Sequence, residues 1–337
     1  MMLFLAFLAV QAGSMPAATN AASGGRFCSS TARLLLTSCS AEVEADLALA
    51  GALCINVSDL TERRQCVADA RDARREASEL CRSQYRGRRA ACRALGEARY
   101  DPQLDPAAFD DDFANPLHPN PYFPLKVGNH WEYKGGIEVN TLDVLNEKKL
   151  IDGLTCVVVR DVVEKSGRLT EDTNDWYAQA KDGTVWYCGE EVKDYESFDA
   201  DQPVTPELVK IDGSFKAGRD GSKAGIIFLA APKAGDAYLE EFSLANAEDA
   251  SYVLSTNYSF GADPTLDRLV PQALAQLLCN GDCVVTRNES LLEPGVSAFK
   301  YFAPGIGFFL ETNPAAGEAV QLTACNFDAR CAALPQP

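Results

Sequence analysis

Twelve cysteines are the residues of this chain whose type and spacing most directly suggest chemistry. Thiols can form disulfides, bind metals or exchange electrons, and their spacing distinguishes these roles. No CxxC pair occurs, and only two histidines, His118 and His130, are present. The usual zinc and thioredoxin-like patterns are therefore missing. An even number of cysteines is typical of proteins that mature in an oxidising compartment, so the sequence predicts structural disulfides.

The first six cysteines are spaced symmetrically about residue 60. Their separations of 11, 15, 12, 15 and 11 residues read the same in both directions. Separations of 11 and 15 are close to three and four turns of an α-helix, so each half places its cysteines near one face. Asp59 with Glu62 predicts a capped start of the second helix, and Gly96 its end. The pattern therefore predicts an antiparallel helical hairpin over residues 26–100. Its three predicted bridges are Cys28–Cys92, Cys39–Cys81 and Cys54–Cys66.

The other six cysteines lie in the second half of the chain. Cys156 and Cys188 fall on neighbouring predicted strands and are expected to pair. The last four, Cys279, Cys283, Cys325 and Cys331, could pair locally as 279–283 and 325–331, or nested as 279–331 and 283–325. Local pairing is slightly favoured.

Carboxylates are the other residues that could do chemistry. Glu171, Asp172 and Asp175, or Glu190 and Glu191, could supply an acid/base pair for hydrolysis. The chain holds 48 acidic residues, so such clusters are expected by chance and favour a solvated surface. No nucleophile elbow, HExxH, P-loop or GxGxxG pattern occurs. The sequence thus predicts no catalytic residues, no metal site and no cofactor.

Aromatic side chains in the predicted strands are the better indication of a binding function. If one set faces the inside of a curled sheet, it either fills a core or lines an apolar pocket, and filling a core is the more common outcome. The candidate ligand-lining residues are Trp131, Tyr133, Trp176, Trp186 and Tyr301.

The elements that must position these residues change near residue 121. Residues 101–121 contain five prolines and an acidic run at residues 110–112, which predicts an extended linker with solvated aspartates. Residues 122–331 contain short β-favouring runs separated by glycine turns, with one helix expected within 263–279. Since no βαβ alternation occurs, the sheet is expected to be antiparallel. The predicted fold class is α+β: a disulfide-stapled α-helical hairpin followed by an antiparallel β-rich barrel or sandwich domain.

Several stretches of the second half carry a resemblance. They are "YFPLKVGNHWEY" from residue 122, "DWYAQAKDGTVWY" from residue 175 and "EPGVSAFKYFAPGIGFF" from residue 293. Over roughly residues 120–325 the chain resembles a group of secreted bacterial proteins that share a "YFPL..G..W.Y" entry strand and a late "APG.G" turn. The resemblance implies a β-rich domain without a known enzymatic role and supplies no active-site residues.

The start of the chain and its net charge limit the compartment and the partners that are expected for the protein. Residues 1–25 are predicted to be a signal peptide and small-residue leader, because an apolar run is followed by small residues at positions 10–12. No later run approaches the length of a membrane span. The net charge is -17, which disfavours nucleic acid as a partner.

Together these features predict a secreted, acidic, disulfide-rich protein without enzymatic activity. Its β domain is expected to bind a lipid or other apolar ligand, or a surface protein of the envelope or extracellular space. An extracellular hydrolase using paired carboxylates and a purely structural secreted module are the alternatives.

Overall fold

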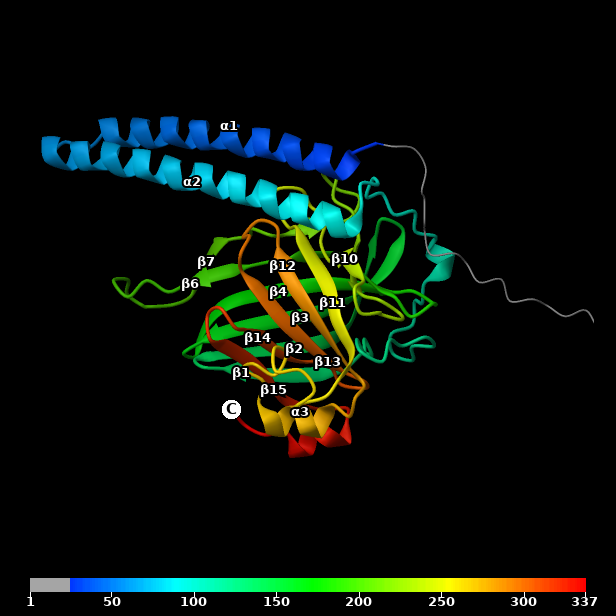
Figure 1. The fold of residues 1–337 in the computed structure, drawn as a ribbon. Coiled ribbons are helices and arrows are strands. Elements are labelled where there is room, and N and C mark those ends of the chain that lie inside the picture. The colour runs from blue at the N-terminus through cyan, green and yellow to red at the C-terminus, as the bar shows by residue number, and fades with distance from the viewer. Residues whose placement is uncertain (1–24) are drawn as a thin grey trace, which may run out of the picture.

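The computed structural model describes residues 25–337, so the predicted leader lies, but for residue 25, outside the described part of the chain. Two long antiparallel helices open the structure: α1 spans Phe27–Ile55 and α2 spans Leu60–Leu95 (Figure 1). The three predicted rungs are observed. They are Cys28–Cys92, Cys39–Cys81 and Cys54–Cys66.

Local sequence sets the ends of α2. The Asp59 carboxylate accepts hydrogen bonds from the backbone N–H groups of Thr61 and Glu62, and Gly96 follows the last turn. These contacts satisfy amide groups that have no partner inside the helix. The α1–α2 turn lies at the free end of an arm that projects beyond the sheet (Figure 1).

The remaining chain forms one 15-stranded antiparallel sheet. Fold class is therefore as predicted, a stapled helical hairpin followed by a β domain. The strands are β1 His130–Gly135, β2 Glu138–Ile151, β3 Leu154–Lys165, β4 Arg168–Gln179, β5 Val185–Glu191, β6 Asp194–Glu196, β7 Glu207–Lys210, β8 Phe215–Lys216, β9 Gly225–Phe228, β10 Ala237–Leu239, β11 Asp249–Tyr258, β12 Cys283–Ser290, β13 Ser297–Ala303, β14 Gly307–Asn313 and β15 Glu318–Cys325.

The sheet curls until its two ends meet. Its order runs from β10 through β15 to β1 and on to β5, with β9 paired to β5. The ends are joined where the Lys223 N–H donates to the Phe242 carbonyl at 2.9 Å. Beside this bond, a Cβ at Gly225 would collide with the Glu240 backbone, so only glycine allows the two segments to approach. The result resembles a barrel with a continuous inner face.

Helix α3, Gln272–Leu278, and the C-terminal 3₁₀-helix Ala329–Ala333 lie together at one end of the sheet, at the bottom of Figure 1. The α3 side chains Leu274 and Leu278 pack with Tyr301 and Phe309 in the main core. The second-half disulfides are Cys156–Cys188, Cys279–Cys283 and Cys325–Cys331, so the pairing of the last four cysteines is local.

Residues 101–121 differ from the predicted solvated linker. Phe113 is fully buried against the sheet, and Asp110 is 7% exposed. The Asp110 carboxylate accepts the His118 backbone N–H at 3.1 Å and contacts the His118 ring at 2.9 Å. A 3₁₀ turn covers Pro106–Ala108. The prolines exclude an ordinary helix, as predicted, but apolar side chains between them bind the segment to the domain.

The C-terminal half of α2 docks on the β domain. The Gln84 amide donates to the Leu292 carbonyl at 2.9 Å, and Ala91 packs against Ala250 and Leu291. Gly87, a poor helix former, lies where a Cβ would be 3.2 Å from Pro294. Its missing side chain therefore allows the helix to lie close to the β12–β13 loop.

Candidate functional site

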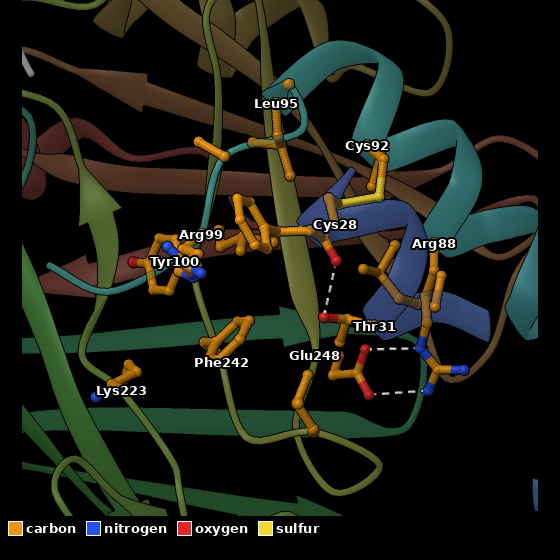
Figure 2. A pocket seen from close by; sticks show the side chains of 18 of the residues that line it. Cys28, Thr31, Arg88, Cys92, Leu95, Arg99, Tyr100, Lys223, Phe242 and Glu248 are labelled. Atoms are coloured by element: carbon orange, nitrogen blue, oxygen red, sulfur yellow. Dashed lines mark hydrogen bonds and ion pairs between the residues drawn. A yellow bond between two sulfur atoms is a disulfide. The ribbon is translucent and has the colours of Figure 1, made fainter. Parts of the chain in front are cut away.

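The most ligand-like cavity lies between the base of the helical hairpin and the end of the sheet (Figure 2). Its volume is about 640 Å³, within the range of about 300–1,000 Å³ that is usual for small-molecule sites. We call it the hairpin cavity. The residues that shape it are Phe27, Thr31, Leu34, Leu35, Arg88, Leu95, Arg99, Tyr100, Lys223, Ile226, Tyr238, Leu239, Glu241, Phe242, Leu244, Glu248 and Leu291.

The apolar wall of this cavity comes from the first turns of α1 and from the sheet end opposite. Phe27, Thr31 and Leu34 follow one another at helical spacing on one face of α1. Across the cavity, the Tyr100 ring packs on Phe242 with centroids 4.8 Å apart. The Tyr100 hydroxyl donates to the Ala224 carbonyl at 2.8 Å. Burial raises the pKa of Tyr100, so this hydroxyl stays a neutral donor. The wall is thus held in place by contacts within the protein.

A buried ion pair closes one side of the cavity. The Arg88 guanidinium donates from Nε and Nη2 to the two Glu248 carboxylate oxygens, each at 2.8 Å (Figure 2). Both side chains are 5% exposed, and Glu248 also accepts the Ala245 backbone N–H at 2.6 Å. A buried charge is tolerated when it is paired in this way. The pair fastens α2 to the sheet and adds no net charge to the cavity.

The other ionisable groups leave the cavity slightly cationic. Lys223 forms an ion pair with Asp101 at 2.8 Å. Glu241 has a pKa raised well above its ordinary value, first by burial and then by the neighbouring Glu190 carboxyl, which favours its neutral form. The exposed Arg99 guanidinium lies 3.8 Å from the centre of the Phe27 ring and has no carboxylate partner among the described residues. One uncompensated cation therefore stands at the rim of an apolar cavity.

Three carboxyl groups of the predicted acid/base set point toward the inside of the sheet. Asp175 on β4 faces Glu190 on β5, and Tyr187 donates a hydrogen bond to Asp175. Burial raises the pKa of Asp175 to about 7 and that of Glu190 to about 8. Glu171 lies four residues before Asp175 on the same face of β4. Its charge further raises the pKa of both Asp175 and Glu190.

The remaining carboxylates of that set point outward. Asp172 pairs with the Arg160 guanidinium at 2.8 Å, and this bond lowers the pKa of Asp172. Glu191 lies 3.4 Å from the Lys193 amine. Successive side chains of a strand face opposite sides of the sheet, so the inward-facing and outward-facing carboxyl groups are separated.

The five candidate ligand-lining aromatics do not share one cavity. Trp131 and Tyr133 line an inner cavity of about 50 Å³, with the Trp131 indole donating to the Ile306 carbonyl and the Tyr133 hydroxyl to the Phe308 carbonyl. Trp176 and Trp186 lie in the outer apolar cluster. Tyr301 is fully buried, and its hydroxyl donates to the Leu266 carbonyl at 2.6 Å.

Both histidines have carboxylate partners that the sequence did not reveal. His118 contacts Asp110, and the His130 Nδ1 lies 2.8 Å from an Asp143 oxygen across the β1–β2 pair. Within residues 25–337 no group of three His, Cys, Asp or Glu side chains is arranged to hold a metal ion. None of the helices in that range is long and apolar enough to cross a bilayer.

The residues that shape the hairpin cavity were missed by sequence reasoning. Arg88 and Glu248 are 160 positions apart, and no sequence pattern singled out Phe27. The one available signal was the arginine-rich second helix followed by an acidic β domain. Opposite charges allow a contact within the chain, although the sequence favours a solvated helix face.

Comparison with known proteins adds no assignment. No family model matches the chain, and no curated protein or solved structure does so. The function must therefore be argued from the geometry of this molecule alone.

Proposed function

We propose that this chain is a secreted binding protein whose hairpin cavity holds a single-chain amphiphile with an anionic head group. The observation that carries the proposal is the apolar cavity of about 640 Å³ with one uncompensated arginine at its rim. An apolar tail would contact Leu35, Leu95 and Phe242, and the head group would lie beside Arg99. Six disulfides favour an oxidising compartment such as the periplasm or the extracellular space.

The charge balance of the cavity supports an anionic rather than a cationic amphiphile. Arg88 and Lys223 are matched by Glu248 and Asp101, and burial favours the protonated form of Glu241. What remains is Arg99, whose planar guanidinium is suited to bidentate contact with a carboxylate or phosphate.

Binding is better supported than hydrolysis by paired carboxylates. None of the three inward-facing acids of the predicted set, Glu171, Asp175 and Glu190, lines the hairpin cavity, whereas Glu241 does. The other carboxylates of the cavity, Glu248 and Asp101, are held in ion pairs. No two free carboxyl groups therefore face a ligand in this cavity.

A chain-length series of straight-chain carboxylates tests the proposal by calorimetry. Each methylene added should tighten binding by about 0.8 kcal/mol, close to fourfold, until the cavity is full. Arg99→Gln should weaken the binding of the carboxylates and leave the affinity for the corresponding alcohols unchanged. Arg93→Gln, an exposed change in the last turn of α2, is the matched control. Affinity that is independent of chain length would contradict the proposal.

Native mass spectrometry of the protein purified from its source gives a second test. We expect a co-purifying amphiphile that is lost when Phe242 is replaced by a charged residue, Phe242→Asp. Ligand-free protein in several independent preparations would count against the proposal.

A further inference from the structure

Three cations gather around the Trp176 ring on the outer face of the sheet. The amines of Lys149 on β2 and Lys216 on β8 lie 4.0 and 4.6 Å from the centre of the Trp176 ring. Arg219 follows in the next turn. Burial lowers the pKa of Lys216, and the charges of Lys149 and Arg219 lower it further. None of the three is within ion-pair distance of a carboxylate in the described part of the chain. Such a cluster is unexpected in a chain of net charge -17.

The cations border a second cavity of about 540 Å³, which we call the outer cavity. Its polar walls include the buried hydroxyls of Ser222 and Ser243, 2.9 Å apart, and Asn246, whose amide donates to the Ser214 carbonyl at 3.0 Å. The cavity also reaches the Glu190 carboxyl on the inner side of β5. Burial raises the pKa of Glu190 to about 8, so it is a donor at neutral pH. Hydroxyl, carboxyl and cationic groups thus surround one space.

Two further acidic residues line the outer cavity. Glu191 lies 3.4 Å from Lys193, which takes up part of its charge, and Asp220 stands in the turn after Arg219. Two cations, Lys216 and Arg219, belong to the lining of the same cavity, and a third, Lys149, contacts its lining residue Trp176. The cations are therefore in excess, and the indole ring beneath the two amines holds them together by cation–π attraction.

We propose that the outer cavity binds a small oxyanion, the phosphate, sulfate or carboxylate group of a polar molecule, between Lys149, Lys216 and Arg219. Like charges held together destabilise one another unless an anion neutralises them. Hydroxyl groups of Ser222 and Ser243 would contact the same group or its hydroxylated neighbour. Among the described residues, only Leu244 lines both this cavity and the hairpin cavity, so the cations that would hold the oxyanion are not those of the amphiphile site.

Titration with inorganic phosphate, sulfate and acetate, each followed by calorimetry and by Trp fluorescence, tests this site. Saturable binding of at least one of these anions is expected, and their order of affinity distinguishes a phosphate or sulfate ligand from a carboxylate. Sodium chloride at equal ionic strength is the control. A response that only follows ionic strength would overturn the proposal.

The variants locate the anion. Lys149→Gln with Lys216→Gln should weaken binding at least tenfold, whereas Lys126→Gln, an exposed lysine distant in sequence from the cluster, should not change it. Arg219→Gln changes an exposed side chain and should not impair folding. It should weaken anion binding several-fold, and it tests the site if the double variant fails to fold. Unchanged affinity in Arg219→Gln and in the folded double variant would exclude this location.

Discussion

The helical hairpin and the curled sheet hold their shapes by different means. The two long helices bury only eight residues, three of them cysteines, and Val43 is the only branched apolar side chain among them. The sheet buries a continuous core that includes Phe309, Leu310 and Leu322, all fully inaccessible. Large apolar side chains of the arm, such as Leu49 at 62% and Ile55 at 76% exposure, contribute nothing to a core.

This difference teaches what the disulfides do in each region. In the hairpin, three bridges replace an apolar core that two helices cannot build. In the sheet, Cys156–Cys188 lies within an already buried cluster, so the bridge adds to a fold that packing supports. The two regions should therefore respond to different perturbations, and each prediction below tests that separation.

The largest effect is expected from a cavity in the sheet. Phe309→Ala removes a fully buried ring that packs beside Tyr301 and should destabilise the β domain by about 3–5 kcal/mol. Urea unfolding followed by near-UV circular dichroism, which reports on the aromatic core, measures this loss. The helical signal at the stapled hairpin should persist to higher urea.

Phe198→Ala, at a side chain that is 42% exposed, is the control and should change stability by less than about 0.5 kcal/mol. Loss of the helical signal in the same transition as the sheet would show that the regions unfold together, against the separation argued here.

The second effect is expected from the middle rung of the hairpin. Cys39→Ser with Cys81→Ser should lower the stability of the helices by about 2–4 kcal/mol, because the bridge restricts the unfolded arm. Amide hydrogen exchange should become faster in residues 36–83 and stay unchanged in the sheet. The matched variant, Cys156→Ser with Cys188→Ser, should affect the sheet and spare the arm. Equal exchange in the arm with and without the middle rung would contradict the role given to the staples.

The sequence predicted the hairpin well because its constraint is local and covalent. Helical periodicity and symmetric cysteine spacing allow one simple pairing, and the Asp59 cap fixed the second helix start. Most of the β-favouring runs form strands in the structure, and "HWEYKG", residues 130–135, is strand β1. Strands β2, β11 and β14 were not anticipated, since their residues read as polar or mixed and are held by pairing with neighbours.

The candidate site could not be predicted in the same way. Its walls come from α1, α2 and the β9–β10 end of the sheet, and contacts such as Arg88–Glu248 depend on how the two regions dock. The aromatic residues were identified as strand residues, but the sequence did not determine which face of the sheet each side chain occupies. In the β4–β5 hairpin, Tyr177 and Tyr187 stack on the inner face, whereas Trp176 and Trp186 lie outside.

A third effect is expected from pH, and it should fall on the sheet alone. Burial raises the pKa of Asp175 to about 7 and that of Glu190 to about 8, so the folded domain binds protons that the unfolded chain releases near pH 4. The stability linked to these groups is present below pH ~4 and is lost as the pH rises through about 8. Each pKa unit corresponds to about 1.4 kcal/mol, which shifts the melting temperature of a domain of this size by ~2–4 °C or more.

Differential scanning calorimetry between pH 5 and pH 8.5 measures this dependence. Glu190→Gln keeps the shape of the side chain and removes its titration, so its melting temperature should fall less over this range than that of the unchanged protein. Glu191→Gln, on the outer face of the same strand, should follow the unchanged protein. The hairpin has no buried carboxylate in its helices, so its hydrogen exchange, corrected for the intrinsic pH effect, should not change. A sheet whose stability rises toward pH 8.5 would show that Asp175 and Glu190 are stabilised as anions, with the Lys300 amine, whose charge lowers the pKa of Asp175, as the nearby positive charge.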